Sequence, residues 1–237
     1  MRRLFRSFDR FGVEYLLISG QASILYGAAT FSEDVDVWLR PSLPNARRLL
    51  RALASQRARV YKLTPVLSLR NMRFGHGFHF TLPRGTDTLF LDVMAVPPRV
   101  GPFEDARRRA TIMDGPYGPV SVVSVPDLVE LKKTQRFLDY DVISNLSAKV
   151  AGQGEIPARI LRWAARNSFR PADRAAVLSR LGEHLSESRC RADILREVGK
   201  FQIRDAAYWR RIVRDLRCLR REGRLIPVGT SVAHLVR

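Results

Sequence analysis

The segment Leu16-Leu-Ile-Ser-Gly-Gln-Ala22, followed closely by Ser32-Glu-Asp-Val-Asp-Val-Trp38, decides the fold of this chain. Residues 13–18 form a short apolar run, the pattern of a strand buried on both faces. The Ser-Gly pair ends this run, and residues 21–26 are expected to form a short helix. Residues 35–39 then alternate apolar and acidic side chains, which is typical of a strand with one functional face. The pattern predicts a strand, a turn, a short helix and a second strand in close succession.

Three aspartates indicate a metal site. Residues i and i+2 of a strand project from the same face, so Asp34 and Asp36 are expected to lie side by side. Carboxylates this close repel each other unless a cation lies between them, and Mg²⁺ or Mn²⁺ prefers such oxygen ligands. A third acid, Asp92, interrupts the apolar run 89–94, where a buried charge requires compensation. If the two strands pair, the three acids converge and can hold two metal ions for phosphoryl transfer. The alternative is that the Asp-x-Asp pair is a solvated feature without a ligand.

The order of these motifs resembles the signature of the polymerase-β-type nucleotidyltransferase superfamily, and within it the minimal and AbiEii-type proteins. The resemblance covers roughly residues 10–145. It includes Val125-Pro-Asp-Leu-Val-Glu-Leu-Lys-Lys-Thr-Gln-Arg136, which is similar to the helix that follows the catalytic sheet in that family. The resemblance implies an α+β fold with a nucleotidyltransferase-like mixed β-sheet flanked by helices, followed by an α-helical C-terminal region.

The resemblance also implies roles for individual residues. Asp34, Asp36 and Asp92 would be catalytic and would bind Mg²⁺ or Mn²⁺. The residues expected to bind the nucleotide are Ser19, Gly20, Ser32, Lys132, Lys133 and Arg136. For the last three, a solvated helix face is an equally good interpretation, and Arg136 can form an intrahelical ion pair with Asp139.

The implied activity is the transfer of a nucleoside monophosphate from an NTP to a hydroxyl acceptor, with tRNA or a partner protein favoured. Several family members are toxins of toxin–antitoxin pairs, so an antitoxin protein is a further expected partner. The alternative is a catalytically inactive protein of this fold that binds nucleic acid or a partner. Two departures from the family pattern favour that alternative: the turn reads Ser19-Gly20 rather than Gly-Gly or Gly-Ser, and Thr30-Phe-Ser32 replaces Arg-x-Thr.

The remaining sequence predicts a helix at 2–11, another at 44–55, and a hairpin whose strands flank the turn-forming segment Pro83–Asp87. Helical patterns follow from Pro126 onward, and further helices are expected at 156–166, 171–187, 190–199 and 204–222. Gly152 and Gly154 suggest a boundary, so we expect a catalytic domain at 1–150 and a basic helical domain at 151–237. His76 and His79, three residues apart, are interpreted as ordinary surface or packing residues because a strand would place them on opposite faces.

The formal net charge of +18 is concentrated in the C-terminal part, where residues 142–237 carry 20 basic against 9 acidic side chains. Such a surplus suits a polyanion, because lysines and arginines that neutralise phosphates release condensed counterions. We therefore expect RNA contact through this half, although a GC-rich genome also favours arginine without any binding role. No apolar run is long enough to span a bilayer, no signal peptide is recognisable, and the expected location is the cytoplasm. The two cysteines, Cys190 and Cys218, are interpreted as ordinary thiols.

Overall fold

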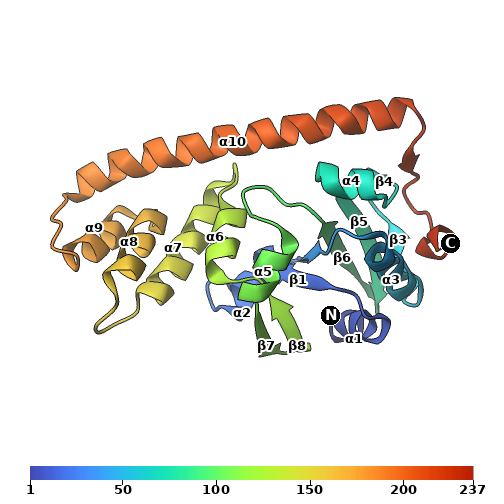
Figure 1. Ribbon diagram of the computed structural model, residues 1–237, viewed down its shortest axis with the longest axis horizontal. Helices are drawn as coiled ribbons and strands as arrows, with labels where there is room; N and C mark the ends of the chain where they lie inside the picture. The colour runs from blue at the N-terminus through green and yellow to red at the C-terminus, as the bar shows by residue number, and fades with distance from the viewer. Residues whose placement is uncertain (237) are drawn as a thin grey trace.

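A computed structural model describes residues 1–236 (Figure 1). Its centre is a seven-stranded mixed sheet in the order β3-β5-β6-β2-β1-β8-β7, and the short strands β4 and β9 form a separate pair. The strands are β1 (Tyr15–Ile18), β2 (Asp34–Leu39), β3 (Arg59–Val60), β4 (Thr64–Pro65), β5 (Gly77–Arg84), β6 (Asp87–Met94), β7 (Thr111–Gly115), β8 (Gly118–Val122) and β9 (Leu225–Ile226). The helices are α1 (Arg2–Phe11), α2 (Ser19–Leu25), α3 (Leu43–Ala54), α4 (Leu69–Phe74), α5 (Phe103–Arg109), α6 (Val125–Lys132), α7 (Phe137–Ala151), α8 (Ala158–Asn167), α9 (Pro171–Ser179), α10 (Glu187–Arg221) and the 3-10 helix η1 (Val232–Leu235). The predicted fold class, a mixed sheet flanked by helices and followed by a helical C-terminal region, is confirmed.

Strand β2 occupies the middle of the sheet and determines where the acids lie. It pairs antiparallel with β1 and parallel with β6, so that Asp36 is opposite Ile18 on one side and Asp92 on the other. The predicted hairpin is confirmed as β5 and β6, and its ladder places His79 opposite Asp92. Because residues opposite each other in a ladder share a face, Asp36, Asp92 and His79 project from the same side of the sheet.

The two faces of the sheet are covered unequally. Along β6, Leu89, Leu91 and Val93 are buried, whereas the residues that alternate with them are half-buried. The buried face packs against α1 and α3. Within this contact, the ring of Tyr15 lies 5.8 Å from that of Phe5 and 5.0 Å from that of Phe8, measured between centroids. The acids therefore lie on the less covered face.

The C-terminal helix differs from its prediction. Two helices were expected at 190–199 and 204–222, but a single helix, α10, runs through 35 residues along one side of the molecule (Figure 1). Gly199, which ends the first of the two expected helices, lies inside α10, where a glycine costs about 1 kcal/mol relative to alanine without stopping the helix. The helix expected at 171–187 ends earlier, at Ser179, and Gly182 follows with a φ of 78°.

Helix α10 is docked onto the sheet half of the molecule by polar contacts. The hydroxyl of Tyr208 donates to the carbonyl oxygens of Gly75 and Val96, at 3.0 and 3.3 Å. The guanidinium of Arg99 donates to Asp205 at 2.6 Å. The division into domains at residue 150 stays a prediction. Among residues 1–236, every helix is too short or too polar to cross a membrane.

Candidate functional site

The three predicted acids lie on neighbouring parallel strands. Asp34 and Asp36 project from β2 and Asp92 from β6, and Asp36 and Asp92 are direct register partners. All three side chains are half-buried on the less covered face of the sheet. The strand pairing thus brings together the residues that the sequence places 56 positions apart.

The acids perturb one another electrostatically. Burial, followed by the charge of Asp92, raises the pKa of Asp36 to about 6, and the charge of Asp34 adds to the effect. Burial and the charge of Asp92 also raise the pKa of Asp34, although nearby Lys62 opposes this shift. Two acids with raised pKa values beside a third carboxylate form a concentrated negative site, and such sites are frequent at functional centres.

Asp92 has two nitrogen partners that the sequence analysis missed. His79 Nδ1 lies 2.8 Å from Asp92 Oδ1, and Lys62 Nζ lies 4.0 Å from Asp92 Oδ2. The interpretation of His79 as an ordinary histidine is therefore wrong. The hairpin carries the signal that would have found it, because counting the ladder back from Arg84 opposite Asp87 leads to His79 opposite Asp92.

His76 lies elsewhere and does not join this site. It is fully buried, and its Nε2 atom lies 2.7 Å from Asp215 of α10. His76 is thus a packing residue, as the sequence analysis expected.

The Ser-Gly turn at the start of α2 contacts the acids and the strand that carries them. Ser19 adopts a φ of 58°, a conformation that is unusual for a residue other than glycine. Its side chain hydrogen-bonds Asp36 and so lowers the pKa of that acid. Backbone strain of this kind is tolerated where neighbouring structure holds it, and it clusters at functional sites.

Gly20 is required for close packing of α2 against Ser32, which lies just before β2. A Cβ atom at this position would lie only 2.2 Å from Ser32 Oγ. The Ser32 carbonyl accepts a hydrogen bond from Gln21 Nε2 at 3.0 Å, which fixes α2 against the approach to β2. Ser19, Gly20 and Ser32 therefore lie together beside the acids, and their role in nucleotide binding stays a prediction.

The predicted cations at the end of α6 are already engaged. Lys132 Nζ donates to Asp139 at 3.0 Å, and Arg136 Nε donates to the same acid at 2.9 Å. Lys133 pairs with Glu130 and lies 4.8 Å from the ring centroid of Phe201. Lys132 and Lys133 are buried, so the interpretation of both as part of a solvated helix face is wrong.

Of these cations, Lys132 belongs to the acidic site. Its charge lowers the pKa of Asp36, whereas Lys133 faces α10 and the side chain of Arg136 is 71% exposed. The ion pair predicted between Arg136 and Asp139 is confirmed.

The donor chemistry of the acids suits a hard divalent cation, although the side chains are not arranged around one. Mg²⁺ and Mn²⁺ prefer carboxylate oxygens, and burial together with the negative charge of Asp92 raises the pKa of Asp36. Within residues 1–236, however, no three acidic, histidine or cysteine side chains are positioned together to hold a metal ion. Binding requires side-chain rearrangement, and Asp92 would have to exchange Lys62 for the ion.

No protein-family model matches the chain, and no curated protein matches its sequence. Among solved structures, an antigenic nucleotidyltransferase-like protein from Paracoccidioides brasiliensis superposes with a TM-score of 0.49 at 18% identity, covering 78% of this chain and 91% of that one. A protein from Thermotoga maritima that has been assigned as a nucleotidyltransferase gives a TM-score of 0.35 at 12% identity. The match covers 53% of this chain and 78% of that one.

Proposed function

We propose that this chain is a metal-dependent nucleotidyltransferase that moves a nucleoside monophosphate from an NTP to a hydroxyl acceptor. The observation that carries the proposal is the placement of Asp34, Asp36 and Asp92 on one accessible face of adjacent parallel strands. A structural role does not account for three carboxylates gathered there, two of which, Asp34 and Asp36, have raised pKa values. Two divalent cations would offset this charge and bind the phosphates of a nucleoside triphosphate.

The three aspartates would hold Mg²⁺ or Mn²⁺, which neutralises charge that develops on the phosphates. Asp92 would accept the proton of the acceptor hydroxyl, the hydroxyl oxygen would attack the α-phosphorus, and pyrophosphate would leave. His79 would orient Asp92 through their hydrogen bond. Ser19, with its hydroxyl on Asp36, and Lys132 would hold the second acid in place.

The acceptor class that we favour is RNA, with tRNA as the first molecule to test. Residues 142–237 carry a large basic excess, which suits a polyanion and not a small neutral acceptor. The likeness to AbiEii-type proteins adds the proposal that the chain is a toxin held by a partner antitoxin.

The experiment uses the four radiolabelled NTPs, Mg²⁺ and a pool of cellular RNA and protein. We expect the wild type to label one macromolecular class with one NTP, and Asp36→Asn to label it at least 100-fold less. Asp87→Asn removes an exposed acid from the turn of the same hairpin and should label normally. No labelling by the wild type, or equal labelling by Asp36→Asn, would overturn the proposal.

A second candidate function is supported by the partners of Asp92. Lys62 and His79 already contact both carboxylate oxygens, so the site can exist without a metal ion. In a catalytically inactive protein that keeps this fold for binding, protein side chains such as Lys62 would take the place of the metal ion beside Asp92. Calorimetric titration with Mn²⁺ and a non-hydrolysable NTP separates the two functions, because an inactive site should bind neither ligand.

A further inference from the structure

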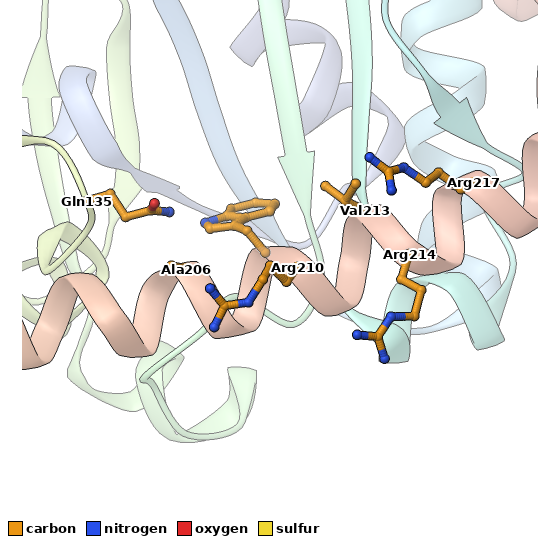
Figure 2. Close-up of a pocket in the computed structure, with 7 residues that line it drawn as sticks. Gln135, Ala206, Arg210, Val213, Arg214 and Arg217 are labelled. Carbon is orange, nitrogen blue, oxygen red and sulfur yellow. The ribbon is translucent and has the colours of Figure 1, made fainter.

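A groove on the sheet side of α10 combines an aromatic side chain with unpaired arginines. It has a volume of about 460 Å³ and is lined by Gln135, Ala206, Trp209, Arg210, Val213, Arg214 and Arg217. Figure 2 shows Val213 and Arg217 on the side of α10 that faces Gln135, whereas Arg210 and Arg214 extend from the other side of the helix in this view. Trp209, Val213 and Arg217 are spaced four residues apart and therefore lie along one ridge of the helix.

The arginines of this groove lack partners because the nearby acids are used elsewhere. Asp205 pairs with Arg99 and Asp215 pairs with Arg70. The remaining acid of this helical end, Glu222, pairs with Arg224. None of the ion pairs within residues 1–236 includes Arg210, Arg214 or Arg217. Three uncompensated guanidinium groups therefore border the half-buried Trp209.

The groove lies next to the proposed active site. Residues 205 and 208 of α10 contact Arg99 and the carbonyl of Val96, which follow β6, the strand of Asp92. On the other side, Gln135 follows α6, whose Lys132 influences Asp36 electrostatically. Trp209 directly follows Tyr208, the residue that fixes α10 to the segment after β6. An RNA strand bound at Trp209 would therefore lie close to that segment.

We infer that this groove binds single-stranded RNA, with a base stacked on Trp209 and phosphates on Arg210, Arg214 and Arg217. An unpaired base can stack on an indole ring, whereas the bases of a duplex are hidden from it. Guanidinium groups match phosphate oxygens in geometry and charge. The inference rests on the proposed function for its choice of RNA, because the groove would lead the acceptor strand toward Asp92.

The test is fluorescence anisotropy of the full chain with a labelled 12-nucleotide single-stranded RNA over a salt series. Trp209→Ala should weaken binding roughly 5- to 100-fold, since base–aromatic stacking contributes about 1–3 kcal/mol. The triple variant R210Q/R214Q/R217Q should reduce the slope of log affinity against log salt by about 2, because each lost single-strand phosphate contact removes about 0.7. Melting temperatures of both variants should remain near the wild-type value.

A matched control removes the same charge from the other end of α10. The variant R189Q/R191Q/R196Q changes three exposed arginines outside the groove and should leave the slope nearly unchanged. An equal loss in this control, an unchanged affinity of Trp209→Ala, or equal affinity for a DNA strand or an RNA duplex would overturn the inference. Absence of RNA binding at low salt would also overturn it and would favour an acidic protein as the partner of this surface.

RNA binding in this test is measured separately from nucleotide transfer. Asp36→Asn should lose nucleotide transfer and keep RNA binding. If the wild type transfers nucleotide but binds no RNA, the proposed function stands and the inference about α10 fails. If RNA binds at Trp209 without any transfer, the inference stands and the proposed function fails.

Discussion

His79 and Asp92 face each other across the β5–β6 hairpin, with His79 Nδ1 only 2.8 Å from Asp92 Oδ1. The other carboxylate oxygen of Asp92 lies 4.0 Å from Lys62 Nζ. The two partners differ in kind. The histidine is fixed by the register of the hairpin and the lysine belongs to an irregular loop. In the proposed metal site, the first would therefore orient the carboxylate of Asp92, while the second would compete with the ion.

This difference predicts opposite effects on metal binding. His79→Ala should weaken Mn²⁺ binding by about 10- to 100-fold, because a residue that orients a ligand has effects of this size. Lys62→Met should strengthen it several-fold, because it removes a positive charge beside the acids. Calorimetric titration measures both changes, and His184→Ala, at an exposed position, is the control. Equal losses in both variants would contradict this division of roles.

The raised pKa of Asp36 predicts how the stability of the metal-free protein responds to substitution and to pH. Its raised pKa, about 6, means that the ionised form is disfavoured in the folded state. Asp36→Asn should therefore stabilise the metal-free protein at pH 7.5 by on the order of 1–3 kcal/mol, from the shift of about two units. Urea unfolding with EDTA measures this gain, and saturating Mg²⁺ should reduce or reverse it.

The sign of the pH dependence follows from the same shift. Between the unfolded-state pKa and the higher folded-state value, the folded protein binds more protons, so this group adds stability as the pH falls through about 6. The advantage of Asp36→Asn should shrink between pH 7.5 and 5. An advantage that grows on acidification would show that burial of Asp36 is not the cause.

The sheet and its acids could be predicted from the sequence because their signals are local. The alternation around Asp34 and Asp36 identifies a strand, and the turn-forming residues between β5 and β6 identify a hairpin. Asp92 is recognisable because a charge inside an apolar strand requires an explanation. Its partner His79 was missed because the register of the hairpin was not followed back to it.

The position of α10 could not be predicted, because its contacts join residues far apart in the chain. Arg99 and Asp205 are separated by 106 positions, and no local sequence pattern around either residue predicts that they pair. The burial of Lys132 likewise depends on Asp139, which returns from the next helix to meet it. The continuity of α10 through Gly199 depends on length and packing, which outweigh the helix propensity of a single glycine.

Loss of the Arg99–Asp205 ion pair is expected to lower the free energy of unfolding substantially. Asp205 is almost fully buried, and Arg99 also donates to the carbonyl oxygens of Glu130 and Leu131. Arg99→Met should destabilise the protein by about 3–5 kcal/mol, because it leaves a buried charge without its ionic partner. Arg99→Met combined with Asp205→Leu should recover much of this loss in urea unfolding. Arg108→Met, which breaks an exposed pair with Asp105, should cost less than 1 kcal/mol.

Gly20 and Ser32 provide a test of the turn beside the acids. A methyl group on Gly20 would lie 2.2 Å from Ser32 Oγ and 2.6 Å from Ser32 Cβ, so Gly20→Ala should destabilise the fold by about 1–3 kcal/mol. If the clash is the whole cause, adding Ser32→Gly should restore most of the stability, because it removes both atoms. Nucleotide binding separates the two roles of the glycine. If Ser32→Gly alone still binds a non-hydrolysable NTP, a double variant that regains its melting temperature but fails to bind would show that the turn at Gly20 contacts phosphate. If stability does not return in the double variant, packing against Ser32 is not the reason for glycine at this position.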